Sequence, residues 1–245
     1  MRGISLLMYH QVGKFPPMRS HRATYCDVDR FRRQMAWLRA FRYHVLDMDQ
    51  VAACLSGARP VPPRAVALTF DDGYENFLTH AAPILERHGF PAIVYVVPTL
   101  LGRPARWLAA DGHATPRLMD AGQLRELQAR GFTIGSHNLV HERMAGQPPE
   151  VQYQTARDSK ARLEDLLGRP CHHFCYPYGS HDAASLQALA RAGYRTGVTC
   201  QRATATADFD PLALPRKAVS FGDSLAGVLW KLHAKHRPKR PPLRR

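Results

Sequence analysis

Cysteine is scarce in this chain. The 245 residues include five cysteines, an odd number, and no two of them stand in a Cys-x-x-Cys pair. Small secreted domains that depend on disulfides carry paired cysteines, and zinc ribbons need the close pairs that are missing here. The cysteine content therefore favours reduced thiols in a cytoplasmic protein over a disulfide-stapled secreted domain.

Long apolar runs are also missing. Residues 1–10 hold a short apolar run that falls well below the core of a secretory signal with its cleavage site. Nowhere does a run approach the roughly 18 apolar residues of a membrane-spanning helix. We therefore expect neither an export signal nor a transmembrane segment.

Acidic residues are few, with 20 Asp and Glu against 34 Lys and Arg, for a formal net charge of +14. Such a surface favours polyanions or anionic membrane faces, but its charge does not identify the partner. Nothing besides this charge supports a nucleic acid partner, and we do not expect one.

The basic charge is concentrated at the carboxyl terminus. Residues 231–245 hold seven Lys or Arg and no acid, and an apolar stretch including Trp230 precedes them. This pattern predicts either a short amphipathic helix with a basic extension at the inner, anionic face of a membrane, or the last helix of the fold followed by a disordered tail.

Apolar strands alternate with helix-like stretches along the rest of the chain, which predicts parallel βα units in a (β/α) barrel. We expect one catalytic domain at 1–233 and a basic tail at 234–245. The loop at 98–119 is long enough to be functional. Strands are expected at 4–9, 65–70, 92–97, 132–134, 173–176 and 194–199, and helices from Asp27 and at 76–89, 120–130 and 150–167.

Two adjacent carboxylates, Asp71 and Asp72, follow the strand at 65–70. Neighbouring side chains of an extended segment point in different directions, so one carboxylate can bind a metal while the other handles a proton. Gly73 allows the backbone to turn sharply after them. Taken alone, the Asp-Asp-Gly sequence is equally well explained as a simple turn between a strand and a helix.

A second polar group, His137 and His141, follows the predicted strand at 132–134. Histidines four residues apart lie on one face of a helical turn, so both can reach one ion, with Asp72 as an oxygen ligand. Two histidines and one carboxylate leave coordination positions open, as in a catalytic site. The spacing alone is more typical of surface or packed histidines, but its coincidence with the Asp pair favours a metal site.

These motifs, together with the segment Phe174-Cys175-Tyr176-Pro177-Tyr178-Gly179, resemble the polysaccharide deacetylases of carbohydrate esterase family 4. The resemblance implies a distorted (β/α) barrel of seven or eight parallel strands. It implies that Asp71 is the general base and that the backbone N–H of Tyr178 helps to hold the oxyanion. It further implies that zinc, or else cobalt, nickel or manganese, is bound by Asp72, His137 and His141.

The sequence departs from the family pattern in two places. Many members carry an arginine that orients the base where this chain has Cys175, and Arg216 is a candidate to replace it from a later strand. A surface arginine after a proline is the alternative reading. The usual carboxyl-terminal Leu-x-His motif is absent, and the run ending in His10 resembles that motif moved to the amino terminus, as in a permuted branch of the family. His10 would then be the general acid.

Cys171, His173 and Cys175 alternate along one predicted strand. Either a second metal site or a buried strand with small thiols would account for them.

The sequence thus predicts a metal-dependent hydrolase that removes the acetyl group from an N-acetylated sugar, whether polymeric, lipid-linked or small. Two alternatives stay open: an O-acetyl carbohydrate esterase on the same scaffold, and a non-catalytic basic binding protein. The intact set of Asp71, Asp72, His137 and His141 argues against the last.

Overall fold

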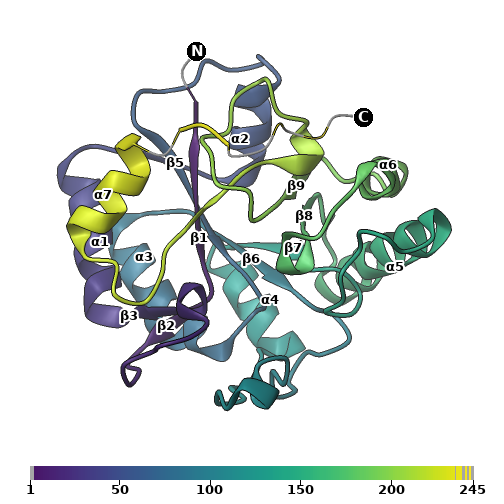
Figure 1. The fold of residues 1–245 in the computed structure, drawn as a ribbon, viewed down its shortest axis with the longest axis horizontal. Helices are drawn as coiled ribbons and strands as arrows, with labels where there is room; N and C mark the ends of the chain where they lie inside the picture. Colours follow the sequence, from purple (N-terminus) through teal and green to yellow (C-terminus); the bar gives the residue numbers. More distant parts are fainter. Residues whose placement is uncertain (1–2, 235, 239–240, 242, 244–245) are drawn as a thin grey trace.

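The computed structural model describes residues 3–234, 236–238, 241 and 243 (Figure 1). Its strands are β1 (Ser5–Tyr9), β2 (Gln11–Gly13), β3 (Tyr25–Asp27), β4 (His44–Leu46), β5 (Ala65–Phe70), β6 (Ile93–Val96), β7 (Thr133–Ser136), β8 (His173–Cys175), β9 (Thr196–Val198) and β10 (Lys217–Ala218). Its α-helices are α1 (Val28–Ala40), α2 (Met48–Leu55), α3 (Ala82–His88), α4 (Ala121–Ala129), α5 (Pro149–Leu167), α6 (Ala183–Arg191) and α7 (Leu225–Ala234).

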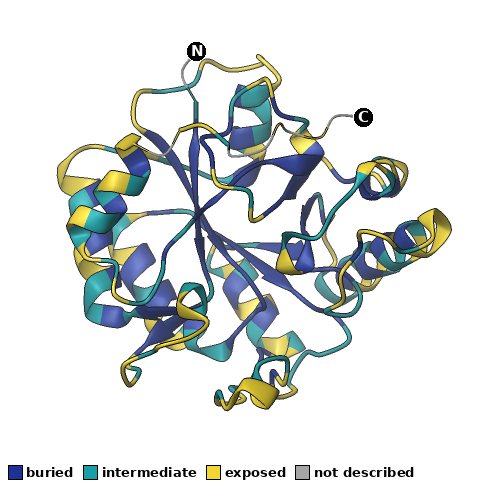
Figure 2. Cartoon of the chain, in the orientation of Figure 1, coloured by how far each residue is buried: buried dark blue, intermediate teal, exposed yellow. Residues whose placement is uncertain are grey.

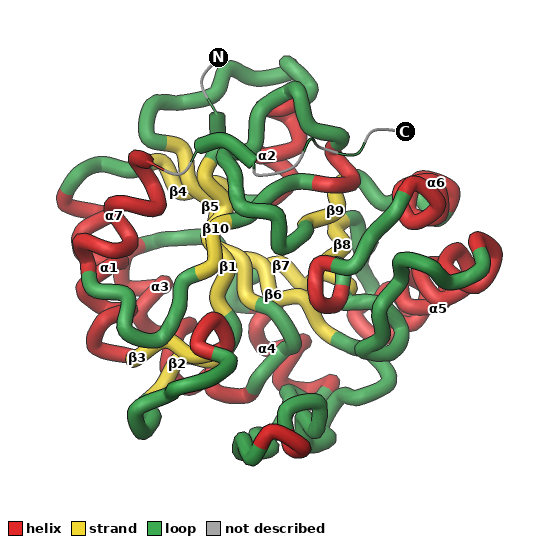
Figure 3. Tube along the Cα trace, viewed as in Figure 1, coloured by secondary structure: helices red, strands yellow, loops and turns green. Residues whose placement is uncertain are grey.

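Within these residues, eight of the strands form one parallel sheet in the order β10-β1-β5-β6-β7-β8-β9, with β4 also paired to β5. β4 and β6 both pair with β5: β4 pairs with residues 65–67, and β6 pairs with Thr69 and Phe70. Figure 3 shows the strands gathered at the centre with the helices around them. The predicted single-domain, distorted (β/α) barrel is confirmed.

The chain segment around β10 closes the barrel. Leu214 forms a parallel bridge with Val198 of β9, and Lys217 and Ala218 pair with β1. The same short segment therefore lies between β9 and β1. Arg216 is part of this segment.

Alternation along the strands sorts the apolar side chains into two cores. Leu6 of β1 and Tyr95 of β6 belong to the core inside the barrel, while Leu7 and Val94 belong to the core between the sheet and the helices. Successive side chains of a strand point to opposite faces, and a sheet covered on both faces must be apolar on both. Figure 2 shows the buried strands inside a rim of partly exposed helices.

Capping interactions define several helix ends. Asp27 caps α1 by accepting from the backbone N–H groups of Asp29 and Arg30. Gly89 and Gly168 end α3 and α5 in the left-handed conformation. The helix predicted at 76–89 begins as a π-helical turn, Phe77–Ala81, before α3.

Other parts of the fold were not predicted. The two-stranded sheet of β2 and β3, the short strand β4 and the helices α2 and α6 have no counterpart among the expected elements. The apolar stretch before the basic terminus forms α7, whose Val228 and Leu232 are buried in the outer core. Within the described residues, no helix combines the length and the apolarity needed to cross a membrane. Much of the predicted tail, at 235, 239–240, 242 and 244–245, lies outside them.

Candidate active site

The residues singled out in the sequence stand at the same edge of the sheet. His10 follows β1, Asp71 and Asp72 follow β5, and His137 follows β7. Because these strands are parallel neighbours, their carboxyl ends meet at one face of the barrel, where barrel enzymes carry their active sites. The sheet therefore brings together residues that are far apart in the chain.

Asp71 and Asp72 point to different partners because the backbone turns between them. Asp72 adopts a positive φ of 74°, and Gly73 follows with a φ of 78°. A Cβ at Gly73 would lie 2.8 Å from a methyl carbon of Val96, so this position needs glycine both for its conformation and for its close approach to β6.

Asp72 lies between two histidines. Its Oδ1 is 3.1 Å from Nε2 of His137 and 3.3 Å from Nε2 of His141. Burial opposes ionisation of the Asp72 carboxyl, but the hydrogen bonds from the two histidines outweigh it and hold its pKa well below its usual range. The carboxylate is therefore negatively charged at neutral pH.

The segment from His137 to His141 is not helical, and this part of the sequence prediction was wrong. The chain bends instead, with Asn138 in the left-handed conformation at φ 65° and its N–H bonded to Ser136 Oγ at 3.2 Å. Thr99 Oγ1 donates to the Leu139 carbonyl at 2.6 Å and holds the bend. The two imidazole rings still converge, with centroids 5.0 Å apart.

These three side chains fit a divalent cation. One donor atom from each of Asp72, His137 and His141 lies within 4.8 Å of the others. His137 Nδ1 donates to the Cys175 carbonyl at 2.8 Å, so in the neutral ring the Nε2 lone pair would be available to a cation held beside Asp72. His141 Nδ1 is buried without a hydrogen-bond partner in the described structure. Two imidazoles and one carboxylate are a common ligand set of catalytic zinc sites.

Asp71 is held by Arg216, which is buried with 1% of its surface exposed. Two guanidinium nitrogens, Nη1 and Nη2, donate to the two carboxylate oxygens at 2.6 and 2.7 Å. Burial raises the pKa of Asp71, but the charge and hydrogen bonds of Arg216 outweigh it and lower the pKa overall. The surface-arginine reading is wrong, and Asp71 is ionised and fixed in direction.

The remaining donors of Arg216 fix it in turn. Nε donates to the Thr199 carbonyl at 3.0 Å, Nη1 also reaches Thr69 Oγ1 at 3.0 Å, and Nη2 lies 3.2 Å from Cys175 Sγ. The small thiol at Cys175 thus leaves room for an arginine that arrives from the closing segment of the barrel.

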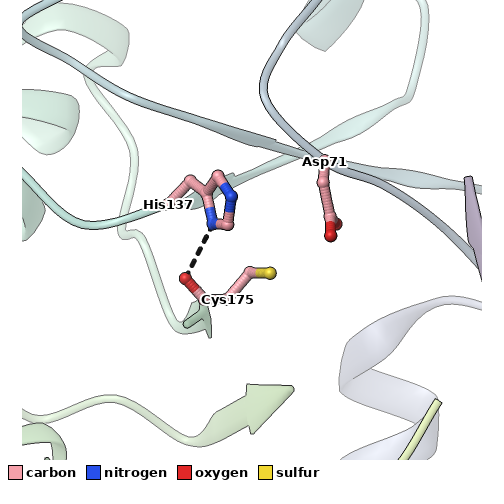
Figure 4. Close-up of side chains that lie close together, drawn as sticks. All are labelled: Asp71, His137 and Cys175. Carbon is pink, nitrogen blue, oxygen red and sulfur yellow. Dashed lines mark hydrogen bonds between the residues drawn. The ribbon is translucent and has the colours of Figure 1, made fainter. Parts of the chain in front are cut away.

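Asp71, His137 and Cys175 form a second close group of donors (Figure 4). Two of these residues already use their polar atoms in hydrogen bonds. His137 Nδ1 donates to the Cys175 carbonyl, and both oxygens of Asp71 accept from Arg216. The alternative second metal site at Cys171, His173 and Cys175 is not assembled among the described residues, because Cys171 lies in the outer core and Cys175 in the inner one.

His10 lies beside the base. Its Nε2 is 3.8 Å from Oδ2 of Asp71, its side chain is 17% exposed, and its Nδ1 is buried without a hydrogen-bond partner in the part of the chain that is described. His10 can therefore face both the buried carboxylate and a molecule in the mouth of the site. Its role as general acid stays a prediction.

Tyr178 forms the rim of the site. It adopts a left-handed φ of 58° three residues after the end of β8, and the residue is 44% exposed. Its ring lies 4.7 Å from that of His141, and the guanidinium of Arg143 lies 4.6 Å from its centroid on the exposed side. The predicted oxyanion function of its backbone N–H is not tested by this geometry.

Sequence reasoning missed three features of the rim. Trp107, from the long loop at 98–119, packs against His141 with ring centroids 4.2 Å apart and donates from its indole to Tyr74 Oη at 3.1 Å. Arg143 covers Tyr178. A groove of about 740 Å³ runs beside the motif, and it is lined by Gly179, His181, Cys200, Gln201, Arg202, Pro241 and Leu243.

The loop at 98–119 that carries Trp107 was expected to be functional from its length alone. The pairing of His113 with Tyr25 at 2.8 Å and of His21 with Asp111 at 2.9 Å ties the loop to the segment before β3. Both histidines thus have hydrogen-bond partners within the structure.

Comparison with known proteins agrees with this geometry. The family model named polysaccharide deacetylase matches residues 58–197, more than half of the chain. A Bacillus subtilis protein named after the same family is 27% identical over 221 residues, covering 90% of this chain and 73% of that protein. A poly-β-1,6-N-acetyl-D-glucosamine N-deacetylase of Escherichia coli K12 is 26% identical over 226 residues, but the match spans only 33% of its length.

Among solved structures, the Streptococcus pyogenes deacetylase PplD in complex with acetate is 27% identical and superposes with a TM-score of 0.80, over 95% of this chain and 99% of that one. A structure of IcaB from Ammonifex degensii, at 23% identity and a TM-score of 0.78, has the same fold. With the family model matched across the strands that carry the two aspartates and the histidines, the chain belongs to the polysaccharide deacetylase family.

Proposed function

We propose that this protein is a metal-dependent deacetylase that removes the acetyl group from an N-acetylated sugar within a polysaccharide. The observation that carries the proposal is the division of labour between Asp71, held by Arg216, and Asp72, held by His137 and His141, within one buried site. Relatives named as poly-β-1,6-N-acetyl-D-glucosamine N-deacetylases, from Escherichia coli and Staphylococcus epidermidis, support the substrate class.

Asp72, His137 and His141 would hold the cation, and zinc suits two imidazoles and a carboxylate best. Cobalt, nickel and manganese can occupy the same ligands, since ligand type discriminates weakly among these ions. When bound, such a cation polarises the acetyl carbonyl and lowers the pKa of water in the site toward neutrality.

The protein's own groups carry the proton transfers. Asp71 is ionised and takes a proton from the attacking water, while Arg216 keeps both of its oxygens in a fixed plane. The backbone N–H of Tyr178 donates to the oxygen that gains negative charge as the tetrahedral intermediate forms. His10, 3.8 Å from Asp71, protonates the departing sugar nitrogen, because an amine leaves poorly unless it is protonated. The products are acetate and an amino sugar.

The groove beside Gly179 and Cys200 supports a polymeric substrate. Its volume of about 740 Å³ offers room for further sugar units next to the reacting one, and Gly179 directly follows Tyr178 of the rim. The solved structure of the Streptococcus pyogenes deacetylase is a complex with acetate, which is a product of the reaction proposed here.

The test is acetate release from β-1,6-linked N-acetylglucosamine oligomers by the purified full chain, before and after treatment with a chelator. We expect release that increases with oligomer length, stops after chelation and returns on addition of Zn²⁺. Acetylated xylan provides the comparison. Release from xylan alone would replace the proposal with an O-acetyl esterase, and release from neither substrate at any metal loading would contradict it.

A further inference from the structure

The edge of the molecule formed by the ends of α1 and α7 exposes large aromatic side chains. Phe41, just after α1, is 50% exposed, and Trp230 of α7 is 61% exposed. Neither residue belongs to a buried core cluster of the described structure. Exposed aromatic residues gathered on one surface are typical of a docking site for another molecule or for a membrane.

The two helix ends form one continuous surface. Trp37 stacks on Phe41 with centroids 4.7 Å apart and packs against Tyr43 at 5.0 Å. Tyr43 in turn shares a hydrogen bond of 2.8 Å with His233 of α7, one helical turn after Trp230. We call this set, Trp37, Phe41, Tyr43, Trp230 and His233, the α1–α7 edge; Figure 1 shows the two helices side by side.

Positive charge surrounds the α1–α7 edge. From Arg30 to Leu46 the chain holds five arginines and no acid, and after Asp223 no acid follows. Arg39 and Arg42 are exposed on either side of Phe41, and Arg64 is exposed while donating to the Phe41 carbonyl at 2.6 Å. Among the described residues, no carboxylate lies within ion-pairing distance of these three.

The apolar face of α7 itself is already used. Val228 and Leu232 are buried in the outer core. Lys231 is turned inward, donating to the Ala218 carbonyl at 2.8 Å and pairing with Asp223. The predicted reading of α7 as the last helix of the barrel is therefore right for these residues, and the helix cannot leave the barrel to lie in a membrane without uncovering the core.

We propose that the α1–α7 edge docks on the surface of an anionic lipid bilayer while the barrel stays intact. Tryptophan and phenylalanine are favoured at the level of the lipid headgroups, and arginines beside them are attracted by the negative surface potential. A single-stranded nucleic acid would instead require a basic groove in which bases stack on aromatic rings. The exposed aromatic residues here, Phe41 and Trp230, line neither of the two pockets beside Tyr43.

The topology fixes how a docked molecule would be oriented. α1 leads into β4, whose His44 pairs with Ala65, the first residue of β5. The end of α7 lies near the start of β1, because Lys217 Nζ donates both to the Leu232 carbonyl and to Ser5 Oγ. The α1–α7 edge is thus at the amino ends of the strands, opposite Asp71 and Asp72.

A protein docked in this way presents its active site away from the bilayer. It would act on polymer segments in the aqueous phase and not on sugars linked to lipids of the same membrane. This orientation does not favour a lipid-linked sugar, one of the substrates that the sequence left open. The predicted cytoplasmic location stays a prediction, because anionic lipid surfaces occur on either side of a cell membrane.

The experiment is flotation of the full chain with vesicles of phosphatidylcholine alone and with about 30% phosphatidylglycerol. We expect binding to the anionic vesicles only, weakened by salt. The double variant Phe41→Ser with Trp230→Ser should lose most of it, and Arg39→Gln with Arg42→Gln should weaken it about tenfold or more. Removal of residues 235–245 separates the contribution of the tail.

The control variants change equivalent residues elsewhere. Arg87→Gln with Arg162→Gln removes the same charge from exposed positions on α3 and α5, and Val151→Ser removes an exposed apolar side chain. Both should bind vesicles nearly as the unmodified protein does. The circular dichroism spectrum of every variant verifies folding. Acetate release from a soluble oligomer by the substitution variants separates this proposal from the proposed function, which could fail independently.

Three outcomes would overturn the proposal. The first is equal binding to neutral vesicles, and the second is equal loss in the edge and control variants. The third is wild-type self-association in sedimentation that the Phe41→Ser and Trp230→Ser pair abolishes while vesicle binding is absent, because the edge would then be a contact between copies of the chain.

Discussion

Arg216 and Asp71 face each other edge to edge, with Nη1 2.6 Å from Oδ1 and Nη2 2.7 Å from Oδ2. A guanidinium plane matched to a carboxylate in this way fixes direction as well as charge. The pair is buried, so removing the arginine entirely would leave an uncompensated carboxylate, at a cost of about 3–5 kcal/mol in stability. A substitution that keeps the positive charge is therefore the better test of position.

Arg216→Lys should fold and keep its metal but lose about 10- to 100-fold in kcat, because a single ammonium cannot hold both oxygens of Asp71. Arg216 lowers the pKa of Asp71, so a weaker hold raises that pKa. The acidic limb of the pH profile of kcat/KM should then move to higher pH. Arg195→Lys, at an exposed ion pair with Asp49, is the matched control. An unchanged kcat and an unmoved limb would contradict the positioning role.

Asp71→Asn and His137→Ala should separate the base from the metal site. The asparagine variant should keep the cation and lose nearly all turnover, because an amide cannot take a proton from water. The alanine variant should lose the cation, since one of three ligands is gone. Metal content by mass spectrometry and acetate release are the two measurements. A fully active Asp71→Asn enzyme would show that another group is the base.

His10→Ala should keep the metal but slow cleavage of an N-acetyl sugar by about 10² to 10⁴, the usual contribution of a positioned general acid. An activated aryl acetate should be affected far less, since its leaving oxygen needs little protonation. Comparison of kcat/KM on the two substrates measures the difference, with His80→Ala at an exposed position as control. Equal losses on amide and ester would point to a binding or structural role for His10.

Lys217 should make stability depend on pH. Its Nζ is buried with Ser5 Oγ and the Leu232 carbonyl as acceptors and with no carboxylate among the described partners, and burial lowers its pKa from 10.5 to about 8. Between these values the unfolded chain holds a proton that the folded chain does not, so the free energy of unfolding rises with pH from about 8 to 10.5. Below pH 8 both states are protonated and this contribution is flat.

Urea unfolding of the wild type and of Lys217→Met at pH 7.5 and 10 measures the effect. The shift corresponds to about 3 kcal/mol at most, and the variant should lack that part of the pH dependence. Other groups titrate in the same range in both proteins, so the difference between the two slopes isolates Lys217. Parallel slopes would show that the lysine keeps its ordinary pKa in the fold.

Much of the site could be predicted because parallel strands deliver their carboxyl ends to one face. Once the apolar runs before His10, Asp71 and His137 were interpreted as parallel strands, the convergence of these residues followed from topology. The approach of Arg216 was only one of two readings, since nothing local shows that the segment after Pro215 closes the barrel between β9 and β1.

The local backbone could not be predicted so well. Two histidines four residues apart fit a helical turn and equally a bend that contains one left-handed residue. In the structure Asn138 adopts the left-handed conformation, and the segment is a bend. Trp107 and Arg143 reach the rim from loops, where no periodic pattern reports position. Strands of three residues such as β2 and β4 are too short to carry an alternating signal.

The closing segment of the barrel also sets the order in which function is acquired as the chain is made. The three candidate metal ligands come from residues 72–141, in the interior of the sequence, whereas His10 and Arg216 come from near its two ends. Their strands meet only when β10 pairs with β1. A nascent chain that has emerged as far as α5 already contains the cation ligands, but the arginine that aligns the base is still unmade. The candidate cation ligands are therefore synthesised before the arginine that aligns the base, and alignment of the base requires the segment that pairs with β1.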